Sequence, residues 1–306
     1  MRLPQNQQSL NHQAIKADSN GIDYDVWTWI PPGYEQSDQP YPLLFVLDGD
    51  MFMSAAVDTV ALMSSIGEAR EAILVGVTTA PPGNHGIQRT IDYSAVAPTA
   101  EIRATPEGAD FNFWLLYEQM AEAGGMEFDD LFGGTDQFHS FLVDQLLPEL
   151  RNTYRIEDNE IGVAGHSSGG DFAVDTLLRE NSPISKFIVG SYGTDVLEAT
   201  LAKREAAFAN RTPDRELKVF SGYGVAEHTD PFLKAYIERG LDLMERLQAN
   251  GPANLTIIVR GFDGETHGSV FPHIFSSGYR ELWGTGLSFV AAVAHAGISE
   301  VLASNK

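Results

Sequence analysis

Residues 160–170 read Glu-Ile-Gly-Val-Ala-Gly-His-Ser-Ser-Gly-Gly, and this stretch decides the fold. Its beginning, Glu160–Ala164, predicts a short buried strand, and residues 169–179 have the spacing of a helix. Between them, residues 165–169 form the pattern Gly-x-Ser-x-Gly. A turn this sharp favours glycines beside the serine, because a Cβ there would clash. The stretch therefore predicts a strand–turn–helix unit that exposes the side chain of Ser167 above the end of a strand.

Strand-like and helix-like segments alternate outward from this unit. The predicted strands are 23–30, 43–47, 72–77, 160–164, 186–192, 216–222 and 255–262, and the predicted helices are 137–153, 169–179 and one beginning near His273. This order predicts an α/β fold, with a mostly parallel central sheet covered by helices on both faces. No linker or repeat interrupts the order, so we expect residues 1–306 to form a single domain.

Residues 95–135 depart from this alternation. They lack strand periodicity and hold aromatic side chains among acids and glycines, namely Phe111, Phe113, Trp114, Tyr117, Phe128 and Phe132. A long aromatic insertion is typical of a lid or a pocket wall. A helical decoration packed on the sheet edge is the alternative, and the two interpretations are compatible.

Composition limits the class of partner. The chain has 42 acidic against 20 basic side chains and a net charge of −22, which disfavours nucleic acid, anionic membranes and highly anionic substrates. It contains no cysteine, which excludes thiol catalysis and disulfides. No segment has the length of a signal peptide core or a membrane span. We therefore expect a cytoplasmic protein that acts on a small molecule; the oligomeric state stays open, a homo-oligomer included.

A serine at such a turn is suited to nucleophilic attack. The amide of Ser168 faces the same space and is a candidate oxyanion donor, assisted by the N-terminus of the helix. Ser168 is also the neighbouring rival as nucleophile, but the glycine spacing centres on Ser167. A surface serine in a glycine-rich turn is the structural alternative.

A serine nucleophile needs a base and an acid, which in this arrangement follow it in the order Ser, acid, His. His267 lies in the loop after the last predicted strand and is the candidate base. Glu227 and Asp230 lie in the loop after the strand before it. We prefer Glu227, which is nearer the strand end, because Asp230 precedes Pro231 and suits a helix N-cap. Asp195 is a weaker third choice.

Other histidines lack such a placement. His273 lies on the following helix and is expected to be structural, and His166 is expected to pack or hydrogen-bond locally. The remaining histidines have no comparable position and are His12, His85, His139 and His295.

A second oxyanion donor is expected from the glycine turn at residues 47–52, Leu-Asp-Gly-Asp-Met-Phe. The amide of Asp50 or of Met51 is the candidate. Asp48 and Asp50 suggest a metal site as an alternative, but two carboxylates without a third ligand nearby speak against it, and we expect no metal or organic cofactor.

Several stretches together resemble the putative-esterase family, which includes enterochelin esterases, S-formylglutathione hydrolase and feruloyl esterases. The matching stretches are 41–49 (YPLLFVLDG), 89–94 (RTIDYS), 133–138 (GGTDQF), 147–150 (LPEL), the serine turn, and 264–270 (GETHGSV). The resemblance spans residues 23 to about 285. It implies an α/β-hydrolase fold and cofactor-free ester hydrolysis, and it carries Ser167 and His267 over, with Glu227 less firmly.

One departure concerns the substrate. The enterochelin-esterase-like branch carries a Ser-Pro-Ser turn and a tryptophan where this chain reads 190–195, Gly-Ser-Tyr-Gly-Thr-Asp. The pocket wall is therefore expected to differ, and the acidic, aromatic insertion does not resemble a pocket for a triply charged siderophore complex.

We therefore expect a serine carboxylic ester hydrolase that works through an acyl-enzyme. An acyltransferase or an amidase or peptidase with the same triad is the alternative. A non-catalytic binding module is a remote alternative, because all the catalytic residue types occur in the expected order.

Overall fold

The computed structural model describes residues 10–81, 83–105, 113–212, 214–287 and 291. Phe111, named above in the aromatic insertion, and His295 lie outside these residues. The described chain forms one eight-stranded sheet in the order β1-β2-β4-β3-β5-β6-β7-β8. Its strands are β1 (Leu10–Lys16), β2 (Asp23–Trp29), β3 (Tyr41–Leu47), β4 (Ile73–Thr79), β5 (Ile156–His166), β6 (Lys186–Gly190), β7 (Leu217–Gly224) and β8 (Leu255–Phe262).

The sheet is mostly parallel, as the alternating pattern predicts. Strands β4, β3, β5, β6, β7 and β8 pair in parallel, and β2 joins β4 antiparallel at one side. Strand β1 was not predicted. Most of its residues are polar and exposed, and it is defined by its pairing with β2, in register from Leu10 opposite Trp29 to Lys16 opposite Asp23.

Helices cover both faces of this sheet. They are α1 (Gly49–Ser65), α2 (His85–Tyr93), α3 (Ala100–Arg103), α5 (Phe113–Gly124), α6 (Thr135–Ser140), α7 (Leu147–Thr153), α8 (Ser168–Leu177), α9 (Glu198–Ala209), α10 (Pro231–Asn250) and α11 (Phe271–Trp283). Shorter turns are the 3-10 segments Tyr34–Gln36, Phe128–Leu131 and Val225–Thr229, and a π-helical segment, Phe141–Leu146.

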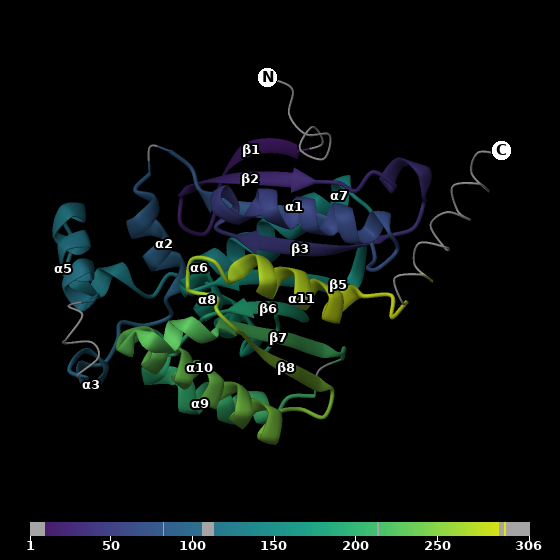
Figure 1. The fold of residues 1–306 in the computed structure, drawn as a ribbon. Helices are drawn as coiled ribbons and strands as arrows, with labels where there is room; N and C mark the ends of the chain where they lie inside the picture. The colour runs from purple at the N-terminus through teal and green to yellow at the C-terminus, as the bar shows by residue number, and fades with distance from the viewer. Residues whose placement is uncertain (1–9, 82, 106–112, 213, 288–290, 292–306) are drawn as a thin grey trace.

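The two faces have separate apolar cores. Strand β3 contributes side chains to both cores, since Phe45 and Leu47 pack on one side of the sheet and Leu44 and Val46 pack on the other. Helices α1 and α11 cover one face and lie side by side in front of the sheet in Figure 1. The other face is covered by α8, α9, α10 and the helical stretch 135–153. Residues 137–153 were predicted as one helix, and in the structure α6, the π-helical segment and α7 follow one another without a break over 135–153.

The aromatic insertion lies at the end of the sheet. Helix α5 stands away from the strands, beside α2 and α3 (Figure 1). Its inner side joins a small apolar cluster that contains Ile87 of α2, Ala121 of α5 and Leu131. The described part of the insertion thus contains α3, α5 and the 3-10 segment Phe128–Leu131 joined by loops, and several of its apolar side chains pack against α2.

Three strands end in strained backbone at the carboxyl edge of the sheet. Asp48 follows β3, Ser167 follows β5 and Ser191 follows β6, with φ angles of 51°, 57° and 41°. These are the described non-glycine residues with positive φ. Such angles are unfavourable for L-residues and cluster at functional sites in proteins. The carboxyl edge around β3, β5 and β6 is therefore the first place to search for function.

Candidate active site

Ser167 lies at the sharp turn between β5 and α8, as its motif predicts. Its backbone has φ 57° and ψ −129°. A Cβ at Gly165 would lie 2.1 Å from the carbonyl oxygen of Gly169, so only glycine fits at that position. The amide of Ser167 donates to the carbonyl of Gly190 at 2.8 Å, which ties the turn to β6. Tertiary contacts thus hold the strained turn in place.

His267 and Glu227 meet beside this turn. The Nδ1 atom of His267 lies 2.8 Å from Oε2 of Glu227. His267 comes from the loop between β8 and α11, and Glu227 from the 3-10 turn after β7. The parallel pairing of β7 and β8 brings the two loops together. The structure therefore brings the preferred acid and the predicted base into direct contact.

Hydrogen bonds keep Glu227 ionised although it is only 2 % exposed. Its Oε1 atom accepts from the hydroxyl of Ser191 and from the amide of Gly224, each at 2.7 Å. Burial raises the pKa of this carboxyl, but the bonds from His267, Ser191 and Gly224 outweigh burial and hold its pKa below the usual value. Sequence reasoning missed Ser191; its place at the end of the neighbouring strand was the available signal.

His166 supports the loop of His267 from behind. Its Nε2 donates to the carbonyl oxygen of His267 at 2.8 Å, and the two rings are 4.6 Å apart. Burial, together with the neighbouring His267, lowers the pKa of His166 to about 4, so its ring is neutral near pH 7. The sequence interpretation expected a local contact; the bond instead reaches a residue 101 positions later.

The rival acids have other partners. The Asp230 carboxylate accepts from the amide of Leu233 at 3.0 Å and caps α10, the role its position before proline suggests. Asp195 forms a two-bond ion pair with Arg239, at 2.6 and 3.0 Å. His273 pairs with Glu265 at 3.2 Å, outside the contact between His267 and Glu227.

Two helix N-termini supply candidate oxyanion donors. The first amides of a helix have no carbonyl partner within it. Ser168 begins α8, and Asp50 is the second residue of α1. The amide of Met51, the other candidate from the sequence, instead donates to the carbonyl of Asp48 at 2.9 Å. Of the two alternatives, Asp50 is therefore the better placed.

A buried ion pair fixes the turn that holds Asp50. The carboxylate of Asp48 accepts from Nε and Nη2 of Arg89 at 2.6 and 2.9 Å. Asp48 is fully buried, and its amide donates to the hydroxyl of Tyr93 at 3.2 Å. Burial opposes the charge of Arg89, but Asp48 raises its pKa above the ordinary value. This pairing gives Asp48 a structural role in place of the metal site considered from the sequence.

Ser167 and His267 open onto one cavity of about 300 Å³. Four rings line it, which we call the aromatic wall: Trp114 and Tyr117 of α5, and Phe232 and Tyr236 of α10. Asp171, on the first turns of α8, also lines it. Asp171, Phe232 and Tyr236 were not predicted from the sequence, because the direction in which their side chains face depends on how α8 and α10 pack.

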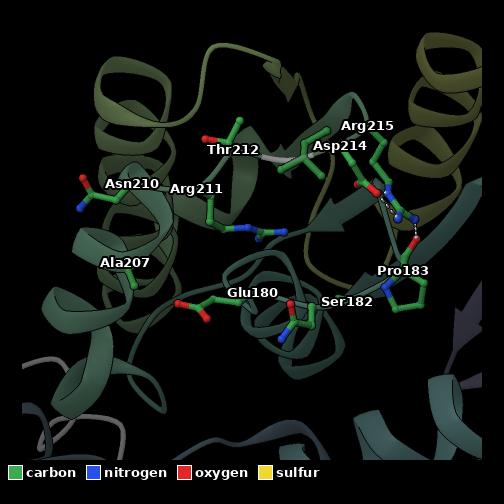
Figure 2. Close-up of a pocket in the computed structure, with 11 residues that line it drawn as sticks. Glu180, Ser182, Pro183, Ala207, Asn210, Arg211, Thr212, Asp214 and Arg215 are labelled. Carbon is green, nitrogen blue, oxygen red and sulfur yellow. Dashed lines mark hydrogen bonds and ion pairs between the residues drawn. The ribbon is translucent and has the colours of Figure 1, made fainter.

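A larger cavity of about 650 Å³ lies near the amino ends of β6 and β7, away from the carboxyl ends that hold Ser167 (Figure 2). Ser182 and Pro183 on one side precede β6, and Leu217 begins β7. Figure 2 shows Arg215 bonded to Asp214 and to the carbonyl of Pro183. The proposed nucleophile and base do not line this cavity, so its size alone does not make it the active site.

The described residues hold no group of three or more histidine, aspartate or glutamate side chains arranged to bind a metal. None of the helices in the described part of the chain has the length and apolarity that a membrane crossing requires.

Comparison with known proteins identifies the family. A family model described as "Putative esterase" matches residues 19–183, more than half of the chain. The chain belongs to the putative esterase family. It is a carboxylic ester hydrolase with the α/β-hydrolase fold. The matched segment includes Ser167 and ends before Glu227 and His267.

The proteins similar to this putative esterase include two that are named for an activity, an esterase and a siderophore hydrolase. The ferri-bacillibactin esterase BesA of Bacillus subtilis is 24 % identical over 245 residues, 78 % of each chain. The BES protein of Bacillus cereus has a TM-score of 0.70 and 21 % identity, covering 92 % of this chain and 96 % of that one. The siderophore hydrolase EstB of Aspergillus nidulans also has a TM-score of 0.70, with 17 % identity over 94 % and 98 % of the two chains. At these identities the structural likeness establishes the fold.

Proposed function

We propose that Ser167, His267 and Glu227 are the catalytic triad of this esterase. The observation that carries the proposal is the 2.8 Å contact between His267 Nδ1 and Glu227 Oε2, beside a strained serine turn on the same cavity. A carboxylate on Nδ1 fixes the tautomer of the imidazole and leaves Nε2 free to accept a proton. The Ser–acid–His order of the chain agrees with this assignment.

Ester cleavage then proceeds in two steps. Ser167 Oγ attacks the ester carbonyl while His267 Nε2 takes the hydroxyl proton, and Glu227 stabilises the resulting imidazolium. The oxyanion accepts hydrogen bonds from the amides of Ser168 and Asp50. Collapse breaks the C–O bond, and His267 returns the proton to the departing alcohol. Water, deprotonated by His267, hydrolyses the acyl-Ser167 ester and releases the acid.

The insertion at 95–135 acts in this proposal as a wall of the substrate cavity. Trp114 and Tyr117 support it, since both line the cavity that contains Ser167. Burial raises the pKa of Tyr117 to about 12, so its hydroxyl stays protonated and can donate a hydrogen bond. The single-domain organisation of residues 1–306 belongs to the same proposal.

We also propose which partners the protein lacks and where in the cell it is located. The net charge of −22 supports a protein that binds neither nucleic acid nor anionic membranes. Cell fractionation tests the cytoplasmic location, and sedimentation equilibrium tests for a homo-oligomer.

Labelling with a fluorophosphonate probe tests the nucleophile directly. We expect one adduct on the folded protein, mapped by peptide mass spectrometry to Ser167, and hydrolysis of p-nitrophenyl esters that the adduct abolishes. Absence of labelling together with absence of ester turnover would refute the triad assignment. An adduct on Ser168 would transfer the nucleophile to its neighbour.

A further inference from the structure

The charged side chains around the active-site cavity do not balance. Among the described residues that line it, Arg89 carries the one permanent positive charge. Its guanidinium is already held by two hydrogen bonds to buried Asp48, at 2.6 and 2.9 Å. Asp195 is neutralised in the same way by Arg239. The cavity therefore offers an anionic ligand no uncompensated cation.

Asp171 is the buried carboxylate of this cavity that has no cationic partner. It is 3 % exposed and accepts hydrogen bonds from the amide of Gly193 at 2.9 Å and from the hydroxyl of Tyr236 at 2.7 Å. These donors are neutral, and no lysine or arginine of the described chain forms an ion pair with it. A buried carboxylate without a cation is unfavourable. A positively charged ligand group in the cavity would remove that penalty.

Burial raises the pKa of Asp171 to about 7, against the opposing hydrogen bonds from Tyr236 and Gly193. The group is therefore ionised in mildly alkaline buffer and responds to a nearby positive charge. Asp230 adds a second carboxylate to the same cavity, where it caps α10.

The aromatic wall suits the same kind of ligand. Trp114 and Tyr117 have ring centroids 5.5 Å apart, and Phe232 and Tyr236 stack at 6.0 Å. Aromatic faces attract ammonium groups through the ring quadrupole, most strongly where water is excluded. The hydroxyl of Tyr236 bonds to Asp171, so one side of the aromatic wall adjoins the unpaired carboxylate.

We propose that this cavity recognises an ester bearing one amine or quaternary ammonium group, and that Asp171 determines this specificity. The inference rests on the proposed function, because it assigns a substrate class to the site of Ser167. The charge of −22 acts in the same direction, since it attracts cationic esters and repels polyanionic ones. The chain thus differs in its expected substrate from relatives named for ferric siderophores.

Three esters of equal length test the proposal. The first ester carries a trimethylammonium group on its acyl end, the second carries the uncharged tert-butyl isostere there, and the third carries a carboxylate. A second set of three esters carries the same groups on the alcohol end. At pH 8 and low salt, we expect kcat/KM for the best cationic ester to exceed that of its isostere about tenfold and that of the carboxylate about a hundredfold. Equal values, or a preference for the carboxylate, would overturn the proposal.

Asp171→Asn identifies the residue responsible. The amide is isosteric and its oxygen still accepts from Gly193 and Tyr236. The ratio of cationic to isosteric ester is expected to fall to within about threefold of one; because both rates come from one preparation, partial unfolding does not affect it. Asp242→Asn, an equal charge change on the exposed side of α10, is the control and keeps the ratio. A ratio that persists in Asp171→Asn contradicts the role of Asp171.

Binding to Ser167→Ala separates this proposal from the proposed function. Titration calorimetry of that variant is expected to give a Kd about tenfold lower for the cationic ester than for its isostere. Equal Kd values overturn the cation specificity even where the wild-type enzyme hydrolyses every ester. The converse outcome is selective binding by Ser167→Ala while the wild-type protein forms no fluorophosphonate adduct and hydrolyses no ester. That outcome overturns the proposed triad and leaves the cation specificity standing.

Discussion

The two sides of the active-site cavity are built by different means. The side with the proposed triad comes from loops directly after parallel strands, with Ser167 and His267 lining the cavity and Glu227 behind them, and hydrogen bonds define its geometry. The aromatic wall comes from helices α5 and α10, and packing positions its rings. Because the two sides come from different elements, each can be altered by mutation without rebuilding the other. Mutations on the two sides should therefore act on different kinetic parameters.

Loss of the nucleophile should have the largest effect. We expect Ser167→Ala to lower kcat about 10⁴-fold or more, since the proposed acyl-enzyme forms on the hydroxyl of Ser167. Initial rates with a p-nitrophenyl ester measure it. Ser168→Ala retains its backbone amide and is expected to lose about tenfold or less. The reverse order would show that Ser168 is the nucleophile.

Loss of the charge on the triad acid should come next. We expect Glu227→Gln to lower kcat about 10²- to 10⁴-fold with a small change in KM, because the amide no longer favours the productive tautomer of His267. Asp230→Asn is the matched control, since asparagine also caps helices well. A larger loss in Asp230→Asn than in Glu227→Gln would reverse the assignment of the acid.

A change in the aromatic wall should act on binding. We expect Trp114→Ala to lower kcat/KM about tenfold, mainly through KM, which corresponds to about 1.4 kcal/mol. Leu116→Ala is the control on the same helix, because Leu116 is 54 % exposed and does not line the cavity. Equal effects of the two variants would favour a decorative role for α5.

The smallest expected effects are on stability, and they concern the two buried carboxylates, Asp171 and Glu227. The raised pKa of Asp171 gives stability at low pH that is lost as pH rises from about 4 to about 7. The lowered pKa of Glu227 gives stability above its unfolded pKa of about 4.5 that is lost as pH falls through its folded pKa.

Urea unfolding between pH 3 and 8 measures these contributions. Relative to wild type, Asp171→Asn should gain free energy of unfolding as pH rises through this window, by roughly 1 to 4 kcal/mol. Relative to wild type, Glu227→Gln should lose free energy of unfolding as pH rises through the acid range. Parallel curves for the two variants would contradict the contrast between the two sides.

The same contrast explains what the sequence could predict. Ser167, His267 and Glu227 were predicted because a glycine-rich turn and the ends of apolar strands leave clear patterns. The fold class was predicted for the same reason. Strand β1 was missed because it is exposed, polar and defined only by pairing with β2.

The recognition residues left no such pattern. Asp171 and Tyr236 look like ordinary helix residues until α8 and α10 pack and their side chains bond to each other. The role of Ser191 likewise depends on the adjacency of β6 and β7, which no local pattern records.

The three left-handed residues Asp48, Ser167 and Ser191 carry a consequence for engineering. Each strained backbone position costs about 1 to 3 kcal/mol of stability, and glycine would relieve it. Selection for heat resistance alone would therefore favour glycine at Ser167, the proposed nucleophile. Asp48→Gly, however, removes the partner of Arg89, and Ser191→Gly removes a hydrogen bond to Glu227. Thermostable descendants obtained by that route would be expected to survive heating and to hydrolyse esters poorly.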